Sequence, residues 1–511
     1  MLLGGAVAGA LALTGSGDAD RSREAAVRRF TTAWARQDPA AMWPALDPAS
    51  KRAHPRSGFV EAYRAAYRAA GVTRVRVLTV NAPEDGASTA SVAVRTRRFG
   101  TLRGTVSLPV TGSGDTAGVR WDASQRLPGL RKGEPVRLRR GTKPKRAAIL
   151  AAGGAALDAD ALGASIVGKV GPPATGLQRL YASRVAGHAS ERLLFGTRVI
   201  GRVPAVRGTV LRTTIRPGLQ QKAAAALGDR LGGIAVVRPR DGAVLALAGL
   251  AVSAPQPPGS TFKIITTAAA LKAGLASPRS TYPVRTAATL SGTKLRNASD
   301  ESCGGTLEEA FAESCNSVFA PLGAKLGARR LVAAARAFGF EEAPRIPAIK
   351  PSTTGGTTAM QDDLAVGAAA IGQNRDLATP LEMATVGATI ANGGVRFRPH
   401  LGASDPPHSA RVVSAKVARQ VRAMMLAVVR SGTGRAAALP GVAVAGKTGT
   451  AELRATAGRA PDPKNTNAWF VAFAPADKPR VAVAVMLIGA GAGGASAAPV
   501  ARDVLAAALA G

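Results

Sequence analysis

Residues 257–271 read PPGSTFKIITTAAAL, and the architecture of the second half of the chain follows from this stretch. Two prolines and a glycine end whatever precedes them, and the apolar run that follows predicts a buried helix from Ser260 to Leu271. Ser260 and Lys263 are three residues apart at the start of this helix, so their side chains share one face. A lysine whose pKa is lowered by burial can take the proton of a neighbouring hydroxyl. Taken alone, Ser-x-x-Lys is a common chance pattern, and a helix cap with a solvated lysine is its simpler explanation.

Short apolar runs typical of strands lie on both sides of this helix in the sequence. Residues 234–237 and 244–248 are separated by a polar turn, which predicts a β-hairpin. Residues 468–474 and 481–488 form a second pair near the C-terminus. Strands at both ends of a helical middle predict one sheet closed by segments far apart in the sequence. The region 228–511 is therefore expected to be one α/β or α+β domain.

A second short motif is Ser314-Cys315-Asn316, which follows an amphipathic helix expected at 306–312. Ser314 supplies a hydroxyl for proton transfer, and Asn316 supplies an amide that can orient a substrate amide. Alone, this tripeptide carries almost no information.

The third motif is Lys447-Thr448-Gly449-Thr450, preceded by the apolar run 442–446. This pattern is typical of an edge strand, which can pair with an extended peptide substrate. We expect Lys447 and Thr448 to bind a carboxylate and Gly449 to leave room for close backbone approach. The backbone N–H groups of Thr450 and Ser260 could form an oxyanion hole.

The order and spacing of the three motifs resemble those of the penicillin-binding proteins, specifically the class B, monofunctional D,D-transpeptidases. Each motif lies in its expected context: a helix start, a loop after a helix and an edge strand. The resemblance covers about 228–511. Similar flanking text is found at 233–248 (GIAVVRPRDGAVLALA), 258–264 (PGSTFKI), 371–394 (IGQNRDLATPLEMATVGATIANGG), 432–452 and 468–470. It implies a serine β-lactamase/transpeptidase-like α/β domain with an antiparallel sheet flanked by helices.

The upstream part of the chain carries a weaker resemblance to the same class. The pattern of residues 21–130 predicts helices followed by strands, and resembles the cone-shaped, nuclear-transport-factor-like N-terminal domain of methicillin-resistance-type class B proteins. Residues 131–227 resemble a degenerate β-rich dimerisation or pedestal domain, because the family's Arg-Gly-x-Ile-x-Asp-Arg-x-Gly is RAAILAAGG at 146–154. The chain is thus predicted to be a multidomain α+β protein.

Residues 1–20 include an apolar stretch from Leu2 to Leu13. It is too short for a stable membrane span and is typical of an export signal, although the positively charged start of such a signal is missing. We expect an extracytoplasmic protein of the cell envelope, exported or membrane-anchored through this segment.

The chain is strongly basic, with 67 Lys and Arg against 32 Asp and Glu and a formal net charge of +35. Such a surface favours anionic partners: nucleic acid, an acidic membrane or an acidic wall polymer. Basic residues are densest between Arg120 and Arg146, but no nucleic-acid motif accompanies them. A solvated basic face explains them more simply, and we expect no nucleic-acid partner. Two Cys and four His argue against a Cys/His zinc site.

The resemblance implies a specific reaction. Ser260 attacks the penultimate D-Ala carbonyl of a peptidoglycan stem peptide, with Lys263 as the candidate base. Ser314 and Lys447 then pass a proton to the leaving group, and no metal or cofactor takes part. The residues implied in substrate binding are Asn316, Thr448, Gly449 and Thr450. The implied partners are stem peptides, β-lactam antibiotics and membrane-associated cell-wall synthesis machinery.

Two alternatives stay open. A serine β-lactamase shares the motifs, but the Glu-x-x-Leu-Asn loop of class A enzymes does not occur between Asn316 and Lys447, and class D enzymes do not match Asn316. A non-catalytic β-lactam-binding scaffold would not need all three motifs intact. A bifunctional enzyme is not expected, because the glycosyltransferase pattern Glu-Asp-x-x-Phe has no counterpart here.

The two cysteines, Cys303 and Cys315, flank the helix expected at 306–312. In an exported domain they can form a disulfide if the loops fold back to bring their Cα atoms within ~7 Å. The alternative is a buried free Cys315. Because all three motifs follow residue 250, we expect the first 130 residues to supply no catalytic group, and a fragment starting near Arg207 to be acylated.

Overall fold

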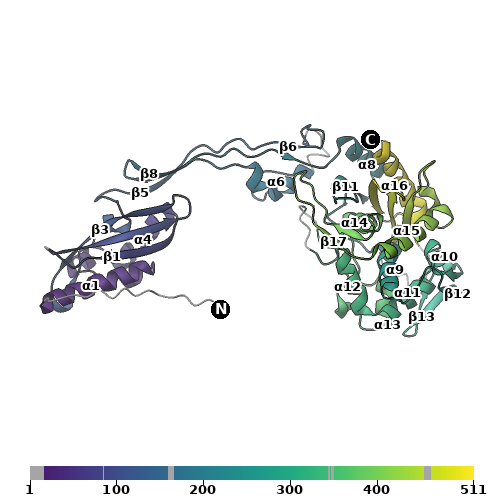
Figure 1. The fold of residues 1–511 in the computed structure, drawn as a ribbon, viewed down its shortest axis with the longest axis horizontal. Coiled ribbons are helices and arrows are strands. Elements are labelled where there is room, and N and C mark those ends of the chain that lie inside the picture. Colours follow the sequence, from purple (N-terminus) through teal and green to yellow (C-terminus); the bar gives the residue numbers. More distant parts are fainter. Residues whose placement is uncertain are drawn as a thin grey trace. The chain divides into compact units, whose positions relative to one another are not determined.

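The computed structural model describes residues 17–84, 86–158, 166–342, 346, 350–453 and 462–510. The chain forms two compact units (Figure 1). One consists of the residues up to Arg146 and of Ala186–Gly208; the other consists of Ala147–Val185 and of the chain from Thr209 onward. The backbone therefore passes between the units three times. The apolar segment predicted to act in export lies outside the described residues.

The first unit begins with helices that bury one apolar face each: α1 (Asp18–Ala35), α2 (Pro39–Met42), α3 (Pro48–Ala53) and α4 (Arg56–Ala70). In α4 the buried side chains recur at helical spacing from Phe59 to Ala70, and Gly71 ends the helix in the left-handed conformation. The core is centred on Trp34, Tyr63 and Trp121.

An antiparallel sheet completes this α+β unit, in the order β1 (Val72–Val80), β2 (Ala87–Thr96), β3 (Thr101–Thr111) and β4 (Gly118–Val119). Alternate residues point to the core, as Val92 and Val94 do on β2. The α+β prediction for this part of the chain is confirmed.

The region predicted as one pedestal, 131–227, is divided between the two units. The first unit contains a three-stranded antiparallel sheet of β5 (Val136–Arg140), β7 (Glu191–Phe195) and β8 (Arg198–Val203). The second unit contains the parallel pair β6 (Ile149–Leu150) and β9 (Leu211–Arg212), with α6 (Gly176–Leu180), α7 (Ala182–Val185) and α8 (Pro217–Leu227). Ile149, Leu177 and Val185 belong to the core of the second unit.

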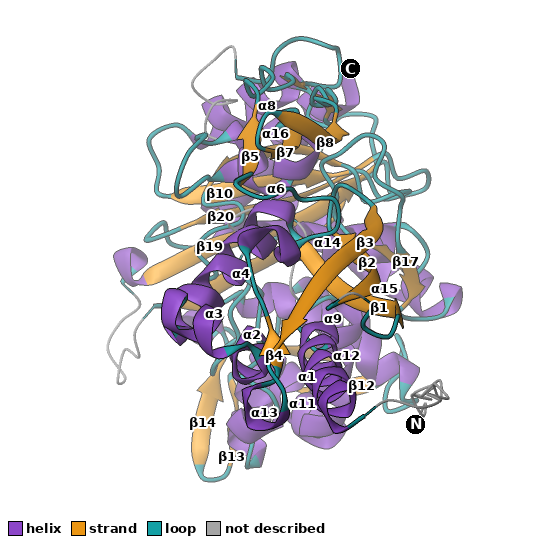
Figure 2. Ribbon diagram, turned by 90° about the vertical axis from the view of Figure 1, so that its left-hand side faces the viewer, coloured by secondary structure: helices purple, strands orange, loops and turns teal. Residues whose placement is uncertain are grey.

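The second unit is built on a five-stranded antiparallel sheet with the order β11-β10-β20-β19-β18. Figure 2 shows its strands β10, β20 and β19 side by side. The strands are β10 (Gly232–Val237), β11 (Val244–Gly249), β18 (Ala445–Glu452), β19 (Thr466–Ala474) and β20 (Val481–Leu487). The predicted hairpin, the closure by distant strands and the edge position of β18 are confirmed.

Helices cover both faces of this sheet, so its strands are buried almost throughout and are continuously apolar. On one face α8 and α16 (Gly493–Ala510) pack against Ile234, Phe470 and Val483. On the other, α9 (Lys263–Lys272), α14 (Pro380–Ala391) and α15 (Ala415–Arg430) share a core with Ala235 and Val471.

The remaining described α-helices and β-strands surround this core. They are β12 (Thr281–Arg285), β13 (Ala287–Leu290), β14 (Thr293–Arg296), β15 (Cys303–Thr306), α10 (Leu307–Ala312), α11 (Asn316–Leu326), α12 (Ala328–Phe338), α13 (Asp363–Ala370), β16 (Val395–Phe397) and β17 (Ser409–Arg411). The predicted multidomain α+β class, with helices flanking an antiparallel sheet, is confirmed.

Candidate active site

Ser260 lies in a single 3₁₀ turn, Gly259–Phe262, that leads directly into α9. The helix predicted from Ser260 therefore begins with this tighter turn, in which side chains three residues apart are aligned along the axis. Ser260 is partly exposed, whereas the next turn, which contains Lys263, is buried. The nucleophile candidate thus faces solvent at the start of a buried helix.

Lys263 has no exposed surface, and its ammonium group is held by the second motif. Its Nζ donates to the carbonyl oxygen of Ser314 at 2.6 Å and to Oδ1 of Asn316 at 2.7 Å, and lies 3.3 Å from Oγ of Ser314. The ring of Phe319 lies 5.4 Å from the nitrogen. Within the described residues Lys263 is bonded to the second motif rather than to the hydroxyl of Ser260.

Ser314 stands in the left-handed region, with φ of +65°, between α10 and α11. A non-glycine residue adopts this conformation only where its surroundings enforce it. Its N–H donates to the carbonyl of Phe311 at 3.2 Å, and the N–H of Cys315 donates to that of Ala310 at 2.9 Å. This reversal turns the hydroxyl of Ser314 toward the two lysines.

Cys315 also ties this reversal to β15. It forms a disulfide with Cys303, with the Cα atoms 5.8 Å apart, and is completely buried. The helix between the two cysteines is α10, whose Thr306 and Glu309 form a capping box. The left-handed turn at Ser314 folds the chain back over this helix. This reversal brings the two cysteines close enough together to form the disulfide.

Lys447 approaches the same hydroxyl from the edge strand β18. Its Nζ donates to Oγ of Ser314 at 2.8 Å and to the carbonyl of Thr448 at 3.1 Å, and it too is fully buried. The ring of Phe311 lies 5.5 Å from this nitrogen. One serine hydroxyl therefore lies between two buried lysines, each beside an aromatic ring.

The two lysines differ in their electrostatic surroundings. Burial lowers the pKa of Lys447 to about 7, and the carboxylate of Glu313 opposes this shift. Burial also holds the pKa of Lys263 well below its usual value, and the nearby charge of Lys447 lowers it further. Because Lys447 has an anion nearby and Lys263 has a cation, Lys263 loses its proton first, which suits it to the role of a base.

Gly449 lets β18 lie close to the turn that contains Ser260. A Cβ at this position would lie 2.8 Å from the carbonyl oxygen of Pro258 and 2.9 Å from Cγ2 of Thr261. The close approach expected at Gly449 is therefore that of the turn containing Ser260, which belongs to the same chain.

Thr450 and Gly449 are also supported from the other face by α16. The N–H of Gly493 donates to Oγ1 of Thr450 at 3.2 Å, and a Cβ on Gly493 would lie 2.3 Å from the carbonyl oxygen of Gly449. The edge strand is thus fixed between the nucleophile's turn and the last helix.

Thr433 is a site residue that the sequence did not single out. Its Oγ1 lies 2.6 Å from Oγ1 of Thr448, and its N–H donates to the carbonyl of Ala312 at 3.2 Å. The sequence does contain a small polar turn there, Ser431-Gly432-Thr433-Gly434, directly after α15. This turn lies inside the region that resembles the penicillin-binding proteins. Glu313 was also missed, because an acidic residue beside a motif has many explanations in a sequence.

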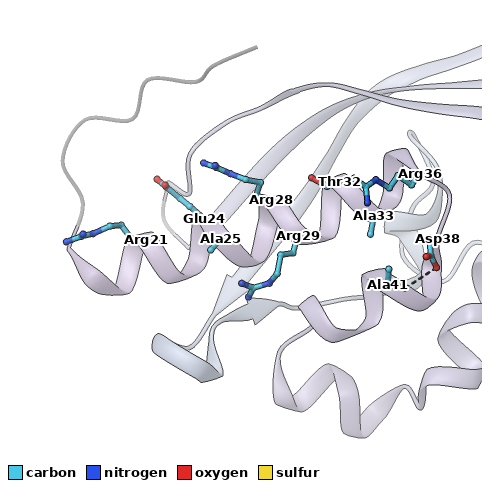
Figure 3. A pocket seen from close by; sticks show the side chains of 10 residues that line it. All are labelled: Arg21, Glu24, Ala25, Arg28, Arg29, Thr32, Ala33, Arg36, Asp38 and Ala41. Carbon is cyan, nitrogen blue, oxygen red and sulfur yellow. Dashed lines mark hydrogen bonds between the residues drawn. The ribbon is translucent and has the colours of Figure 1, made fainter. Parts of the chain in front are cut away.

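The first unit has hollows of its own that contain none of these motifs. Figure 3 shows one of about 660 Å³ along α1, lined by the arginines Arg21, Arg28, Arg29 and Arg36 and by the carboxylates of Glu24 and Asp38. Among the described residues, no cluster of His, Cys, Asp and Glu could hold a metal ion. In the same part of the chain, no helix combines the length and hydropathy needed to cross a membrane.

Comparison with protein families identifies the domain that contains Ser260, Lys263, Ser314 and Lys447. The penicillin-binding protein transpeptidase domain matches residues 232–506. The chain belongs to this family. The NTF2-like N-terminal transpeptidase domain matches residues 22–134 of this penicillin-binding protein. The resemblance inferred from the motifs is confirmed.

Named relatives agree with this assignment. The peptidoglycan D,D-transpeptidase PbpA of Mycolicibacterium smegmatis is 37% identical over 414 residues, which cover 66% of this chain and 80% of the relative. PbpA of Mycobacterium tuberculosis is 36% identical over 422 residues, covering 66% and 82%.

Solved structures are similar as well. The ceftriaxone acyl-enzyme complex of M. tuberculosis penicillin-binding protein A matches with a TM-score of 0.62 and 30% identity, over 72% of this chain and 99% of that one. Its penicillin G acyl-enzyme complex matches with a TM-score of 0.60 and 30% identity, over 72% and 100%. This penicillin-binding protein therefore shares its fold with proteins that β-lactams acylate.

Proposed function

We infer that this chain is a peptidoglycan D,D-transpeptidase that works through a serine acyl-enzyme and is acylated by β-lactams. The observation that carries the mechanism is the hydroxyl of Ser314, which lies 2.8 Å from Nζ of Lys447 and 3.3 Å from Nζ of Lys263. Two buried lysines with lowered pKa values around one hydroxyl form a path for protons and not a solvated surface.

In the first step Oγ of Ser260 attacks the penultimate D-Ala carbonyl of a stem peptide, and neutral Lys263 takes the hydroxyl proton. A tetrahedral oxyanion forms, for which the backbone N–H groups of Ser260 and Thr450 are the proposed donors. The C–N bond then breaks, and the terminal D-Ala leaves as an amine that receives a proton from Ser314. Lys447 replaces that proton, since it already donates to the same oxygen.

In the second step an amine of a neighbouring stem peptide attacks the ester carbonyl. The attacking amine gives up a proton through Ser314 to Lys447, and a new amide bond links the two stems. The ester C–O bond breaks, and Oγ of Ser260 takes back the proton held by Lys263. The edge strand β18 offers its free edge to the extended donor peptide, and Lys447 with Thr448 is proposed to bind its terminal carboxylate. Asn316 accepts from Lys263 and donates to the carbonyl of Arg296 at 2.7 Å, so its proposed role includes fixing the base.

Benzylpenicillin tests this function directly. Intact-mass spectrometry after brief exposure is expected to show a single adduct that persists, because the opened lactam obstructs the incoming nucleophile. Ser260→Ala is expected to abolish the adduct and to leave the unfolding temperature nearly unchanged. A D-Ala-terminated stem peptide incubated with a D-amino acid acceptor is expected to give the exchanged product in the wild type alone.

The two alternatives give other results in the same experiment. Turnover of penicillin that depends on Ser260 without an accumulated adduct would assign a serine β-lactamase. Folded protein with no adduct at high drug concentration would assign a non-catalytic scaffold.

The family of cell-wall transpeptidases is extracytoplasmic, and we propose the same location for this chain. Anchoring through residues 1–20 and association with membrane-bound cell-wall synthesis machinery are part of this proposal. Fractionation of cells expressing the full chain and a chain without residues 1–16 tests the anchor. Equal release of both from the membrane fraction would contradict it.

A further inference from the structure

The outer face of the N-terminal sheet carries a concentration of arginines that the transpeptidase reaction does not use. A hollow of about 460 Å³ lies over β1, β2, β3 and the β2–β3 turn. Its lining contains six arginines and no carboxylate: Arg74, Arg76, Arg95, Arg97, Arg98 and Arg103. The face is opposite to the one that packs on the helices, since Val75 and Val94 point into the core.

The strand register brings like charges together across this face. Arg74 on β1 is directly opposite Arg95 on β2. Cβ atoms of directly opposed residues are about 4.5–5.5 Å apart, and like charges there destabilise a sheet. In the adjacent row, Ala93 stands between Arg76 and Arg103. The side chain in the middle of the hollow is therefore a methyl group, and the side chains on either side of it are cationic.

These charges are almost unpaired. Arg98 forms an ion pair with Glu191. The other five arginines form no salt bridge with any residue that the structure describes. The hollow along α1 differs in this respect, because Glu24 and Asp38 line it beside its arginines. A sheet that keeps an opposed arginine pair without an internal anion is suited to an external one.

We propose that this hollow binds a diphosphate group, or two closely spaced phosphates, of a ligand outside the reaction site. Guanidinium groups match phosphate oxygens in bidentate geometry, and several of them converge here from three strands. A single carboxylate would neutralise only one of the five free cations, whereas a diphosphate carries several negative charges. The hollow is concave, which suits a compact anion better than a flat lipid surface.

Calorimetric titration of the full chain with inorganic diphosphate at low salt tests this site. The wild type is expected to bind, and Arg74→Gln/Arg95→Gln to bind at least about tenfold more weakly. Arg28→Gln/Arg29→Gln on α1 removes the same charge and is expected to change the affinity less than about twofold. Diphosphate should also raise the unfolding temperature of the wild type but not of the sheet variant.

Several results would overturn the proposal. An equal loss of diphosphate affinity in both double variants would mean that only the net charge of the protein matters. Absence of diphosphate binding to the wild type would mean that there is no site. Binding to phosphatidylglycerol vesicles but not to diphosphate, with the same dependence on Arg74 and Arg95, would make this face a membrane surface. Benzylpenicillin acylation at Ser260 is expected to be normal in every variant, which separates this test from that of the transpeptidase.

Discussion

Lys263 and Lys447 come from a helix and from an edge strand that are far apart in the sequence, and both reach the hydroxyl of Ser314, at 3.3 Å and 2.8 Å. Two protonated lysines this close repel one another, which is why the charge of Lys447 lowers the pKa of Lys263. The pair therefore favours the state in which Lys263 is neutral and Lys447 is charged. That state contains a base beside the nucleophile's turn and an acid for the leaving group.

Glu313→Gln is expected to shift the pH profile of acylation. The carboxylate of Glu313 raises the pKa of Lys447 against burial, so its removal lowers a pKa that is about 7 in the wild type. Lys447 must be protonated to donate, so the rate falls as pH rises through its pKa. The descending limb of the second-order acylation rate should move to lower pH. Glu313→Asp keeps the charge and should retain most of the wild-type profile; an unmoved limb in Glu313→Gln would contradict the assignment.

Lys263→Ala should lower the acylation rate by ~10²–10⁴-fold, the usual contribution of general-base catalysis. Lys263→Arg should also be slow, because a guanidinium does not deprotonate at neutral pH. Stopped-flow measurement with a chromogenic cephalosporin checks both variants. Lys272→Ala, at the other end of α9, is the control and should react normally. Acylation of Lys263→Arg at the wild-type rate would exclude a base at this position.

Gly449→Ala should reduce acylation strongly because the added Cβ would lie 2.8 Å from the carbonyl oxygen of Pro258. Either β18 or the turn of Ser260 must shift, and overpacking of this kind costs about 1–3 kcal/mol. Gly218, an exposed position on α8, offers a control, because a Cβ there would meet nothing within 4 Å. Gly218→Ala should keep full acylation. The idea fails if the crystal structure of Gly449→Ala shows both segments unmoved and the acylation rate is retained.

The disulfide between Cys303 and Cys315 should be present in the exported protein, so thiol titration of denatured, unreduced protein should find none free. Cys303→Ser should lower stability by about 2–4 kcal/mol and slow acylation, because the bridge fixes the turn of Ser314. Reductant should produce the same change in the wild type and no further change in the variant. Two free thiols in the wild type would refute the bridge.

Removal of the first unit should leave acylation intact, provided that the deletion keeps every segment that packs in the core of the second unit. A fragment starting near Arg207 would lack Ile149 and Leu177, which belong to the core of the second unit. The N–H of Thr209 donates to the carbonyl of Arg184 at 2.8 Å, so residues 147–185 can be joined to 209–511 by a short glycine linker. This chain should be acylated at the wild-type rate. A folded product that does not react would give the first unit a role in the chemistry.

Much of the fold was predictable because its signals are local. The hairpin of β10 and β11, the helix after Gly259 and the start of the edge strand that contains Lys447 all appear as apolar runs bounded by turn residues. The division of residues 131–227 was not predictable. Whether β6 pairs with β9 or joins β5 depends on contacts between distant segments, and the short runs there carry no periodicity that decides it.

The sequence predicted which residues come together in the site, but not the hydrogen bonds that they form there. Spacing placed Lys263 beside Ser260, whereas its hydrogen bonds go to Ser314 and Asn316. The left-handed turn of Ser314 has no sequence signal, because serine rarely adopts it without tertiary support. Thr433 reaches the site through the packing of its loop on α10. The polar turn at 431–434 marks that loop in the sequence, but not the contact that the loop makes.

The support that α16 gives to the edge strand has a consequence for when the enzyme becomes active. The N–H of Gly493 donates to Oγ1 of Thr450, and this glycine begins an 18-residue helix that is synthesised after every catalytic residue. The nucleophile and both lysines are already synthesised by then, but β18 is not yet supported by α16. A chain that ends before Gly493 thus contains every catalytic residue but lacks the support of β18, so acylation should require this helix to be present and folded.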